Sequence, residues 1–289
     1  LDAPALLQPL LGVGQDAIEF GCREPHPEPE GLQQFPQRPV DSARQFAEHR
    51  THRPRLSRQG NDLLGHGRIV HVAVGPPNLS LPVQDALVAV REVISQQVEY
   101  LGQIDSVAGD GDHGIGMQRG AVAAEKRGEE LLGLQAGVRS HLGGVADAWS
   151  DESGGTSGAI WGVILRSVAE ATTDDAPLDR FCLARGLNQA AEAVRAFGGA
   201  VVGDKTIVDA LEPLVAEFSR AVGQGDGLSV AWSRAASAAE EAADGTKSMV
   251  ARTGRSKKHG EKSVGTPDPG AWSLALIARA ISYQLESEK

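Results

Sequence analysis

Hydrophobic residues recur at intervals of three or four from Leu81 onward, and this spacing limits the fold more than any other feature of the sequence. The first such stretch contains Val83, Leu87, Val90, Ile94, Val98 and Leu101. Residues at these intervals share one face of an α-helix. Similar stretches follow at roughly 116–128, 134–150, 157–171, 178–197, 206–222, 228–247 and 270–286. Their short connections favour antiparallel neighbours, so the sequence predicts an all-α fold, an eight-helix up-and-down bundle.

The first 80 residues have a different composition. They contain ten of the 15 prolines and five of the eight histidines, and they sustain no helical or strand period. We expect residues 1–80 to form a poorly ordered segment, because so little apolar surface is available to bury. An alternative is that this segment is not a genuine part of the protein. The run Ile69–Val74 is a candidate strand without a clear partner. The predicted folded domain is therefore 81–289.

Charge and hydropathy exclude several functions. The formal net charge is −10, which argues against nucleic acid, because phosphate contacts need clustered Lys and Arg. A nucleotide is not excluded, since a bound metal can supply positive charge. The sequence has no apolar run of the roughly 18–20 residues that span a bilayer, and no signal-peptide pattern at the N-terminus. A cytoplasmic location is therefore expected, with Cys22 and Cys182 as unpaired thiols.

Three carboxylates follow the first predicted helix, at Asp105, Asp110 and Asp112. Three like charges within eight residues repel one another unless a cation lies among them. Carboxylate oxygens combined with substrate phosphates are the ligands that Mg²⁺ prefers. The spacing does not match an EF-hand. A solvated acidic turn is the alternative, but the flanking glycines favour a metal site.

Two glycine-rich helix starts offer backbone donors to phosphate. The first is His113–Gly116, which follows the acidic loop; His113 is a candidate nucleotide contact, a neighbour of the metal ligands or an ordinary loop histidine. The second is Ser153–Gly158, in which Thr156 and Ser157 could bind phosphate or cap the helix. This second stretch is not a Walker A motif, since no lysine follows.

Two further connections carry charge. In Gly198–Thr206, Asp204 is a candidate cap for the helix that follows, and Lys205 is a cation that could reach phosphate. The alternative is that this stretch only caps the helix. In the basic loop from Ala251 to Gly260, Arg255 could grip a phosphate with two hydrogen bonds, or the loop could be solvated. One end of an up-and-down bundle collects every second connection. We therefore expect these four connections to meet in one phosphate site, a combination suited to phosphoryl transfer.

Five motifs, in this order, resemble the nucleotide-binding L domain of dihydroxyacetone (glycerone) kinases over residues 81–286. They are D-S-x-x-G-D-G-D-H-G, G-G-T-S-G, G-D-K-T-x-x-D-A-L, A-R-x-G-R and D-P-G-A. The resemblance implies an eight-helix antiparallel barrel that binds ATP or ADP, with two Mg²⁺ ions held by Asp105, Asp110 and Asp112. The nucleotide contacts that it implies are His113, Gly114, Ile115, Gly116, Thr156, Ser157, Gly198, Ile207, Arg255, Asp268, Pro269 and Gly270.

The resemblance also implies a partner. In this family the ketose is bound by a separate K domain, which residues 1–80 are too short to form, so a separate K-type subunit is expected. Some relatives use ATP, and others keep ADP that a phosphotransferase-system partner rephosphorylates. The acceptor that the resemblance implies is dihydroxyacetone or a four-carbon ketose such as erythrulose, and no residue of this chain is assigned as a catalytic base. The alternatives are a nucleotide-dependent regulatory module and a fatty-acid kinase component; the end of the sequence at Lys289 counts against the second.

Overall fold

The structure is a computed structural model that describes residues 62–65 and 68–287, with backbone alone at 62–65, 68–71, 255, 256, 258 and 259. Eight α-helices form the described part of the chain: α2 (Leu81–Ser106), α3 (His113–Gly133), α4 (Val138–Ser153), α5 (Gly155–Glu170), α6 (Arg180–Gly198), α7 (Val208–Gly223), α8 (Leu228–Gly245) and α9 (Pro269–Ser287). Two 3₁₀ helices, η3 (Thr246–Ser248) and η4 (Arg255–Ser263), lie between α8 and α9. Each predicted helix matches one observed helix, which confirms the all-α fold.

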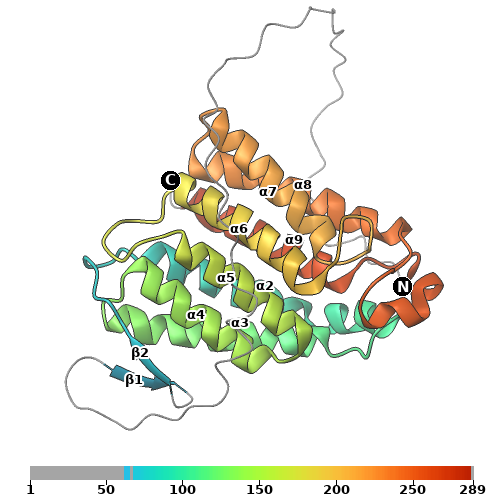
Figure 1. Cartoon of the computed structure of the whole chain (residues 1–289), viewed down its shortest axis with the longest axis horizontal. Helices are drawn as coiled ribbons and strands as arrows, with labels where there is room; N and C mark the ends of the chain where they lie inside the picture. The colour runs from blue at the N-terminus through green and yellow to red at the C-terminus, as the bar shows by residue number, and fades with distance from the viewer. Residues whose placement is uncertain (1–61, 66–67, 288–289) are drawn as a thin grey trace, which may run out of the picture. The chain divides into compact units, whose positions relative to one another are not determined.

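The helices form a closed ring. Each helix packs against the next along the chain, and α9 packs against α2 to complete the circle (Figure 1). Because consecutive helices alternate in direction, the connections after α2, α4, α6 and α8 lie at one end of the barrel. The connections after α3, α5 and α7 lie at the opposite end. The loops that carry chemistry in the sequence are the four at the first end.

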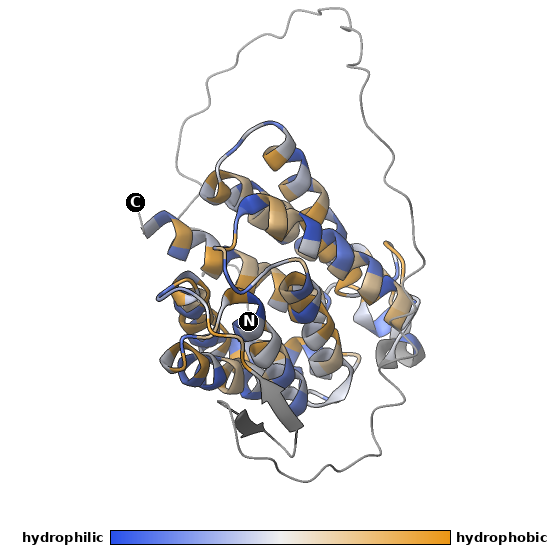
Figure 2. Ribbon diagram, turned by 60° about the vertical axis from the view of Figure 1, so that its left-hand side comes forward, coloured by the Kyte–Doolittle hydropathy of each residue, from blue (hydrophilic) through white to orange (hydrophobic). Residues whose placement is uncertain are grey.

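Small residues allow the helices to approach closely. Figure 2 shows hydrophobic and hydrophilic residues interleaved along the helices, as amphipathic helices require. The inward face of α8 is made largely of fully buried alanines. Between α3 and α4, a Cβ added to Gly120 would lie 2.7 Å from Nε1 of the buried Trp149. Trp149 in turn stacks on Trp161 of α5, with ring centroids 5.3 Å apart.

The structure corrects the prediction for the segment before α2. A strand, β2 (Arg68–His71), overlaps the candidate strand and has a partner, β1 (Asp62–Gly65), with which it pairs in antiparallel register. The next residues are bonded to the barrel: Gly75 N–H donates to the Gln135 carbonyl at 2.9 Å, and Gly137 N–H donates to Ala73 at 3.0 Å. Residues from about 72 therefore belong with the helical domain, whereas the prediction for 1–61 lies outside the described residues.

Two predictions about the remaining sequence concern membranes and thiols. None of the helices described for this chain is long and apolar enough to cross a bilayer. Cys182, near the start of α6, is a free thiol and is partly exposed. Cys22 lies outside the described residues.

His141 of α4 is fully buried at the end of the barrel away from the four loops. Neither ring nitrogen has a hydrogen-bond partner among the described residues. A Cβ added to Gly128 of α3 would lie 3.1 Å from His141 Nε2. Burial lowers the pKa of His141 to about 4 from 6.5, so the ring is neutral in the folded protein at neutral pH.

This histidine predicts acid sensitivity. Below pH 6.5 His141 becomes protonated in the unfolded chain but stays neutral in the folded one. The free energy of unfolding is therefore highest above pH 6.5 and decreases as the pH falls toward 4. At 1.36 kcal/mol per pH unit, we expect a loss of about 2 kcal/mol between pH 7 and pH 5. Urea unfolding at both pH values measures it. His141→Leu should remove that part of the pH dependence, and an equal pH dependence in the variant would contradict the assignment.

Candidate functional site

A cleft lies at the end of the barrel where the connections after α2, α4, α6 and α8 meet. Its volume is about 830 Å³, including space open to solvent. Every one of the four connections contributes to its lining, which consists of Asp105, Asp112, His113, Thr156, Ser157, Ile160, Trp161, Lys205, Thr206, Ile207, Thr253, Gly254, Asp268, Pro269 and Gly270. The structure thus brings together the four loops that the sequence pointed to.

The acidic loop brings its three carboxylates together. One carboxylate oxygen each from Asp105, Asp110 and Asp112 can be chosen so that all three lie within 4.8 Å of one another. Two glycines make this possible. A Cβ at Gly109 would lie 2.3 Å from Asp105 Oδ1, and Gly111 has a φ of +79°, which favours glycine. Oxygen ligands so close together suit a hard divalent cation.

His113 connects three helices beneath the cleft. Its backbone N–H donates to Asp105 Oδ2 at 3.3 Å. Its Nε2 lies 3.1 Å from Ser273 Oγ of α9, and its Nδ1 lies 3.3 Å from Ser157 Oγ of α5. Burial lowers the pKa of His113, and the nearby Asp105 carboxylate only partly offsets this. The imidazole therefore holds the starts of α3 and α5 and the first turns of α9 in one arrangement.

The rest of the His113–Gly116 stretch lies away from the cleft wall. α3 begins at His113, earlier than predicted, so all four residues belong to its first turn. Gly114 is buried against α2, Ile115 is exposed, and the Gly116 carbonyl accepts a hydrogen bond from Ser153 Oγ at 2.9 Å. Of the four, only His113 lines the cleft.

The start of α5 opens onto the cleft. Gly154 and Gly155 have φ values of +67° and +60°, which turn the chain sharply so that Thr156 and Ser157 stand in the first turn. The first N–H groups of a helix have no partners within it, so they are available to an anion. Ile160 and Trp161 also line the cleft. They were missed in the sequence, although they lie one helical turn after Thr156 and Ser157 and therefore share their face.

The connection between α6 and α7 corrects two predictions. Ile207 lines the cleft, but Gly198 is exposed and is not part of the lining. Asp204 does not cap α7; its carboxylate accepts from Val201 N–H at 3.0 Å. The carboxylate that fixes the turn before α7 is Asp209, in the first turn of the helix, which accepts from Gly203 N–H at 2.6 Å and Thr206 N–H at 2.7 Å. Asp209 lies five residues beyond Asp204 and reaches back from the helix over the turn that precedes it.

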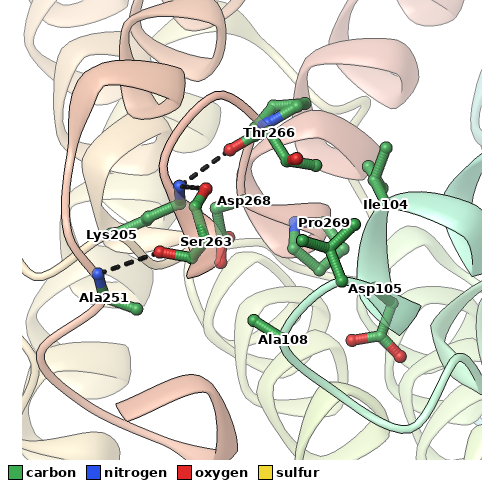
Figure 3. Close-up of a pocket in the computed structure, with 11 residues that line it drawn as sticks. Ile104, Asp105, Ala108, Lys205, Ala251, Ser263, Thr266, Asp268 and Pro269 are labelled. Carbon is green, nitrogen blue, oxygen red and sulfur yellow. Dashed lines mark hydrogen bonds between the residues drawn. The ribbon is translucent and has the colours of Figure 1, made fainter. Parts of the chain in front are cut away.

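The last connection closes the cleft with Asp268, Pro269 and Gly270. The Asp268 carboxylate accepts a hydrogen bond from Ala271 N–H at 2.8 Å and so caps α9. Burial raises the pKa of Asp268 to about 7, and the carboxylate of Asp209 adds to the effect. A smaller pocket lies between these residues and the end of α2, with Asp105 opposite Asp268 (Figure 3).

Two basic residues of these loops have different outcomes. Arg255 begins η4, but its side chain lies outside the part that the structure describes, so its predicted phosphate contact stays a prediction. Lys205 lines the cleft, yet its ammonium is buried and bonded to backbone carbonyls. Burial lowers its pKa.

Comparison with known proteins decides the family. The family model described as the DAK2 domain matches residues 107–283 of this chain. This chain belongs to the DAK2-domain family. The match covers α3 to α8 completely and nearly all of α9, together with all four loops of the cleft except Asp105 at the end of α2.

Several relatives of this DAK2-domain chain are kinases. It is 47% identical over 206 residues to an L-erythrulose kinase of Pectobacterium atrosepticum, covering 71% of this chain and 35% of the relative. It is 42% identical over 200 residues to a D-erythrulose kinase of Mycolicibacterium smegmatis, covering 69% of this chain and 34% of that relative. It is 32% identical over 191 residues to the ADP-binding subunit DhaL of the PEP-dependent dihydroxyacetone kinase of Escherichia coli, covering 66% of this chain and 90% of that subunit.

A solved structure shares the fold. The dihydroxyacetone kinase of C. freundii in complex with AMP-PNP and Mg²⁺ matches with a TM-score of 0.55 and 22% identity, over 78% of this chain and 38% of that one. The chain thus spans about a third of the length of the erythrulose kinases that it matches, but nearly the whole of the DhaL subunit.

Proposed function

We propose that this DAK2-domain chain binds a magnesium nucleotide and provides the phosphoryl group for a small ketose, with erythrulose as the leading acceptor. The observation that carries the proposal is that Asp105 and Asp112, two of three clustered carboxylates, line one cleft together with the open start of α5 and the turns Thr253–Gly254 and Asp268–Gly270. The greater identity to erythrulose kinases than to the dihydroxyacetone kinase subunit supports a four-carbon acceptor ahead of dihydroxyacetone.

The donor set fits magnesium. Asp105, Asp110 and Asp112 offer oxygen alone, in an arrangement that glycines at 109 and 111 hold open. In this proposal these three side chains hold the metal, and the resemblance of the motif to its family implies two Mg²⁺ ions. A bound Mg²⁺ neutralises phosphate charge and orients the phosphates. The aspartates need only hold position, since phosphoryl transfer asks of the protein mainly alignment and charge compensation.

The remaining lining residues suit the other parts of a nucleotide. Thr156 and Ser157, with the free N–H groups of the α5 start, lie where phosphate oxygens would accept hydrogen bonds. Ile160, Trp161 and Ile207 give the cleft an apolar wall against which a planar base could pack. Arg255 and the turn Asp268–Gly270 are proposed as further nucleotide contacts from the resemblance.

The ketose is proposed to be held by a K-type unit, in a separate subunit or elsewhere in the polypeptide. None of the described residues of the cleft is assigned as a general base, because His113 is engaged on both ring nitrogens by serine hydroxyls. The phosphoryl donor is proposed to be ATP, or ADP retained as a coenzyme and recharged by a phosphotransferase-system protein. A cytoplasmic location belongs to the same proposal.

One experiment tests activity, acceptor and partner together. The purified chain is mixed with Mg-ATP and a K-type subunit, then offered L-erythrulose, D-erythrulose or dihydroxyacetone, and sugar phosphate is measured by mass spectrometry. We expect product only with the K-type subunit present, and faster formation from an erythrulose. Firm nucleotide binding with no product from any ketose would favour a regulatory module over a kinase. Preference for dihydroxyacetone with every K-type subunit that yields product would contradict the acceptor assignment alone.

A further inference from the structure

Lys205 occupies an unusual position at the rim of the cleft. Its backbone has a φ of +61°, in the left-handed region that side chains other than glycine rarely adopt. Only 5% of the residue is exposed. A lysine held in this backbone conformation and buried to this extent needs interactions that compensate both costs.

The compensation comes from three backbone carbonyls. The Lys205 ammonium donates to Met249 at 3.2 Å, to Thr266 at 2.7 Å and to Ser263. An ammonium has three N–H donors and no acceptor, so the three carbonyls use its full capacity. Figure 3 shows the side chain directed to Ser263 and Thr266, while Asp105 lies on the other side of the pocket.

The carbonyls belong to both limbs of the long loop between α8 and α9. Met249 lies on the limb that leaves α8, whereas Ser263 and Thr266 lie on the limb that returns to α9. Further bonds close the same loop: Arg252 N–H donates to the Asp204 carbonyl at 3.1 Å, and Ala251 N–H donates to Ser263 Oγ at 3.2 Å. Lys205 therefore joins the two limbs to each other and to the turn before α7.

The loop so held provides a wall of the cleft. Thr253 and Gly254 follow the Met249 limb, and Asp268 to Gly270 follow the Thr266 limb. We infer that Lys205 is a positioning residue, which sets the α8–α9 loop in its nucleotide-binding arrangement and does not itself bind phosphate. The inference rests on the proposed nucleotide site, and it replaces the sequence-based expectation that Lys205 reaches a phosphate.

Two variants and one control test it in the full-length chain. Lys205→Met removes the ammonium, and Lys205→Gly removes the side chain while suiting the left-handed backbone. Lys126→Met removes an exposed lysine of α3, far along the sequence from the loop, and serves as the charge-matched control. Affinities for Mg-ADP and for adenosine are measured by calorimetry. Tryptic cleavage is followed at Arg252, Arg255, Lys257, Lys258 and Lys262, all of which lie in the loop.

We expect both Lys205 variants to lose about tenfold or more in affinity, the scale expected when buried carbonyls lose a charged donor. The loss should be similar for Mg-ADP and adenosine, because a displaced wall affects the whole nucleotide. Cleavage within the loop should accelerate, and propylammonium should restore the affinity of Lys205→Gly. Tetramethylammonium, which cannot donate hydrogen bonds, should not. Lys126→Met should behave as the wild-type chain.

Other outcomes overturn the inference. A loss confined to Mg-ADP, with unchanged loop cleavage, would make Lys205 a phosphate ligand, and no loss at all would remove any role. If both variants fail to fold, acylation of the wild-type lysines decides. If Lys205 is bonded to the three carbonyls, it is not acylated with or without nucleotide. If it is a phosphate ligand, it is acylated freely until nucleotide is added. Failure of the wild-type chain to bind nucleotide would contradict the proposed function. The cleavage and acylation results would still show whether Lys205 holds the α8–α9 loop in place.

Discussion

Asp110→Asn should abolish magnesium-dependent nucleotide binding while leaving the helical fold intact. Asparagine keeps the size of the side chain but removes one of three charges that lie within 4.8 Å of one another. We expect the affinity for Mg-ADP to fall more than roughly 100-fold, since residues that merely orient metal ligands already cost about 10- to 100-fold. Calorimetric titration with ADP, with and without Mg²⁺, measures the effect, and circular dichroism checks the helix content.

Measurements on the metal-free protein distinguish loss of the metal site from a folding defect. Without Mg²⁺ the three carboxylates repel one another and repel phosphate, so Asp110→Asn should bind free ADP no more weakly than the wild-type chain and should melt no earlier. Glu129→Gln, at an exposed position near the opposite end of α3, is the control and should change neither quantity. Unchanged Mg-ADP affinity in Asp110→Asn would remove the metal assignment, and with it the main argument for phosphoryl transfer.

The sequence predicts the fold well because the fold depends on local periodicity. The spacing of apolar residues indicated eight helices, and the ends of most agree with the structure within a few residues. The largest differences are at the end of α3, which continues to Gly133 rather than 128, and at the start of α4, which begins at Val138 rather than 134. Both lie at the connection between these two helices, where the apolar spacing does not mark the boundary. The pairing of β1 with β2 could not be predicted, since pairing depends on contacts between segments rather than on the pattern of either one.

The candidate site was predicted less completely, and the misses have a common cause. The four loops were identified because Gly, Asp, Ser and Lys are visible in a sequence, and the alternation of an up-and-down barrel brings them together. Hydrogen-bond partners are not visible in the same way. Asp204 and Asp209 are both close enough in sequence to bond the turn before α7, and Lys205 could as well reach solvent as backbone. Only the positions of the carbonyls in the α8–α9 loop decide that Lys205 is buried.

Gly114→Ala should damage both stability and nucleotide binding. Gly114 lies where α3 starts against α2, and an added Cβ would lie 2.0 Å from the Val98 carbonyl oxygen. Because the opposing atom belongs to the backbone of α2, the clash cannot be relieved by a side-chain rotation. The start of α3 must move, and Asp112 and His113 move with it. We expect a loss of about 3 kcal/mol in the free energy of unfolding, measured by urea titration.

Gly133→Ala, at the last residue of the same helix, separates this clash from the ordinary effect of a glycine. An added Cβ there meets nothing within 4 Å, so alanine should be neutral or should stabilise the helix by about 0.5–1 kcal/mol. If Gly114→Ala were as stable as the wild-type chain, the close approach of α2 and α3 would be wrong. If it lost stability yet bound Mg-ADP normally, the start of α3 would not position the site. The aspartate loop would then have to hold its geometry without support from the helix that follows it.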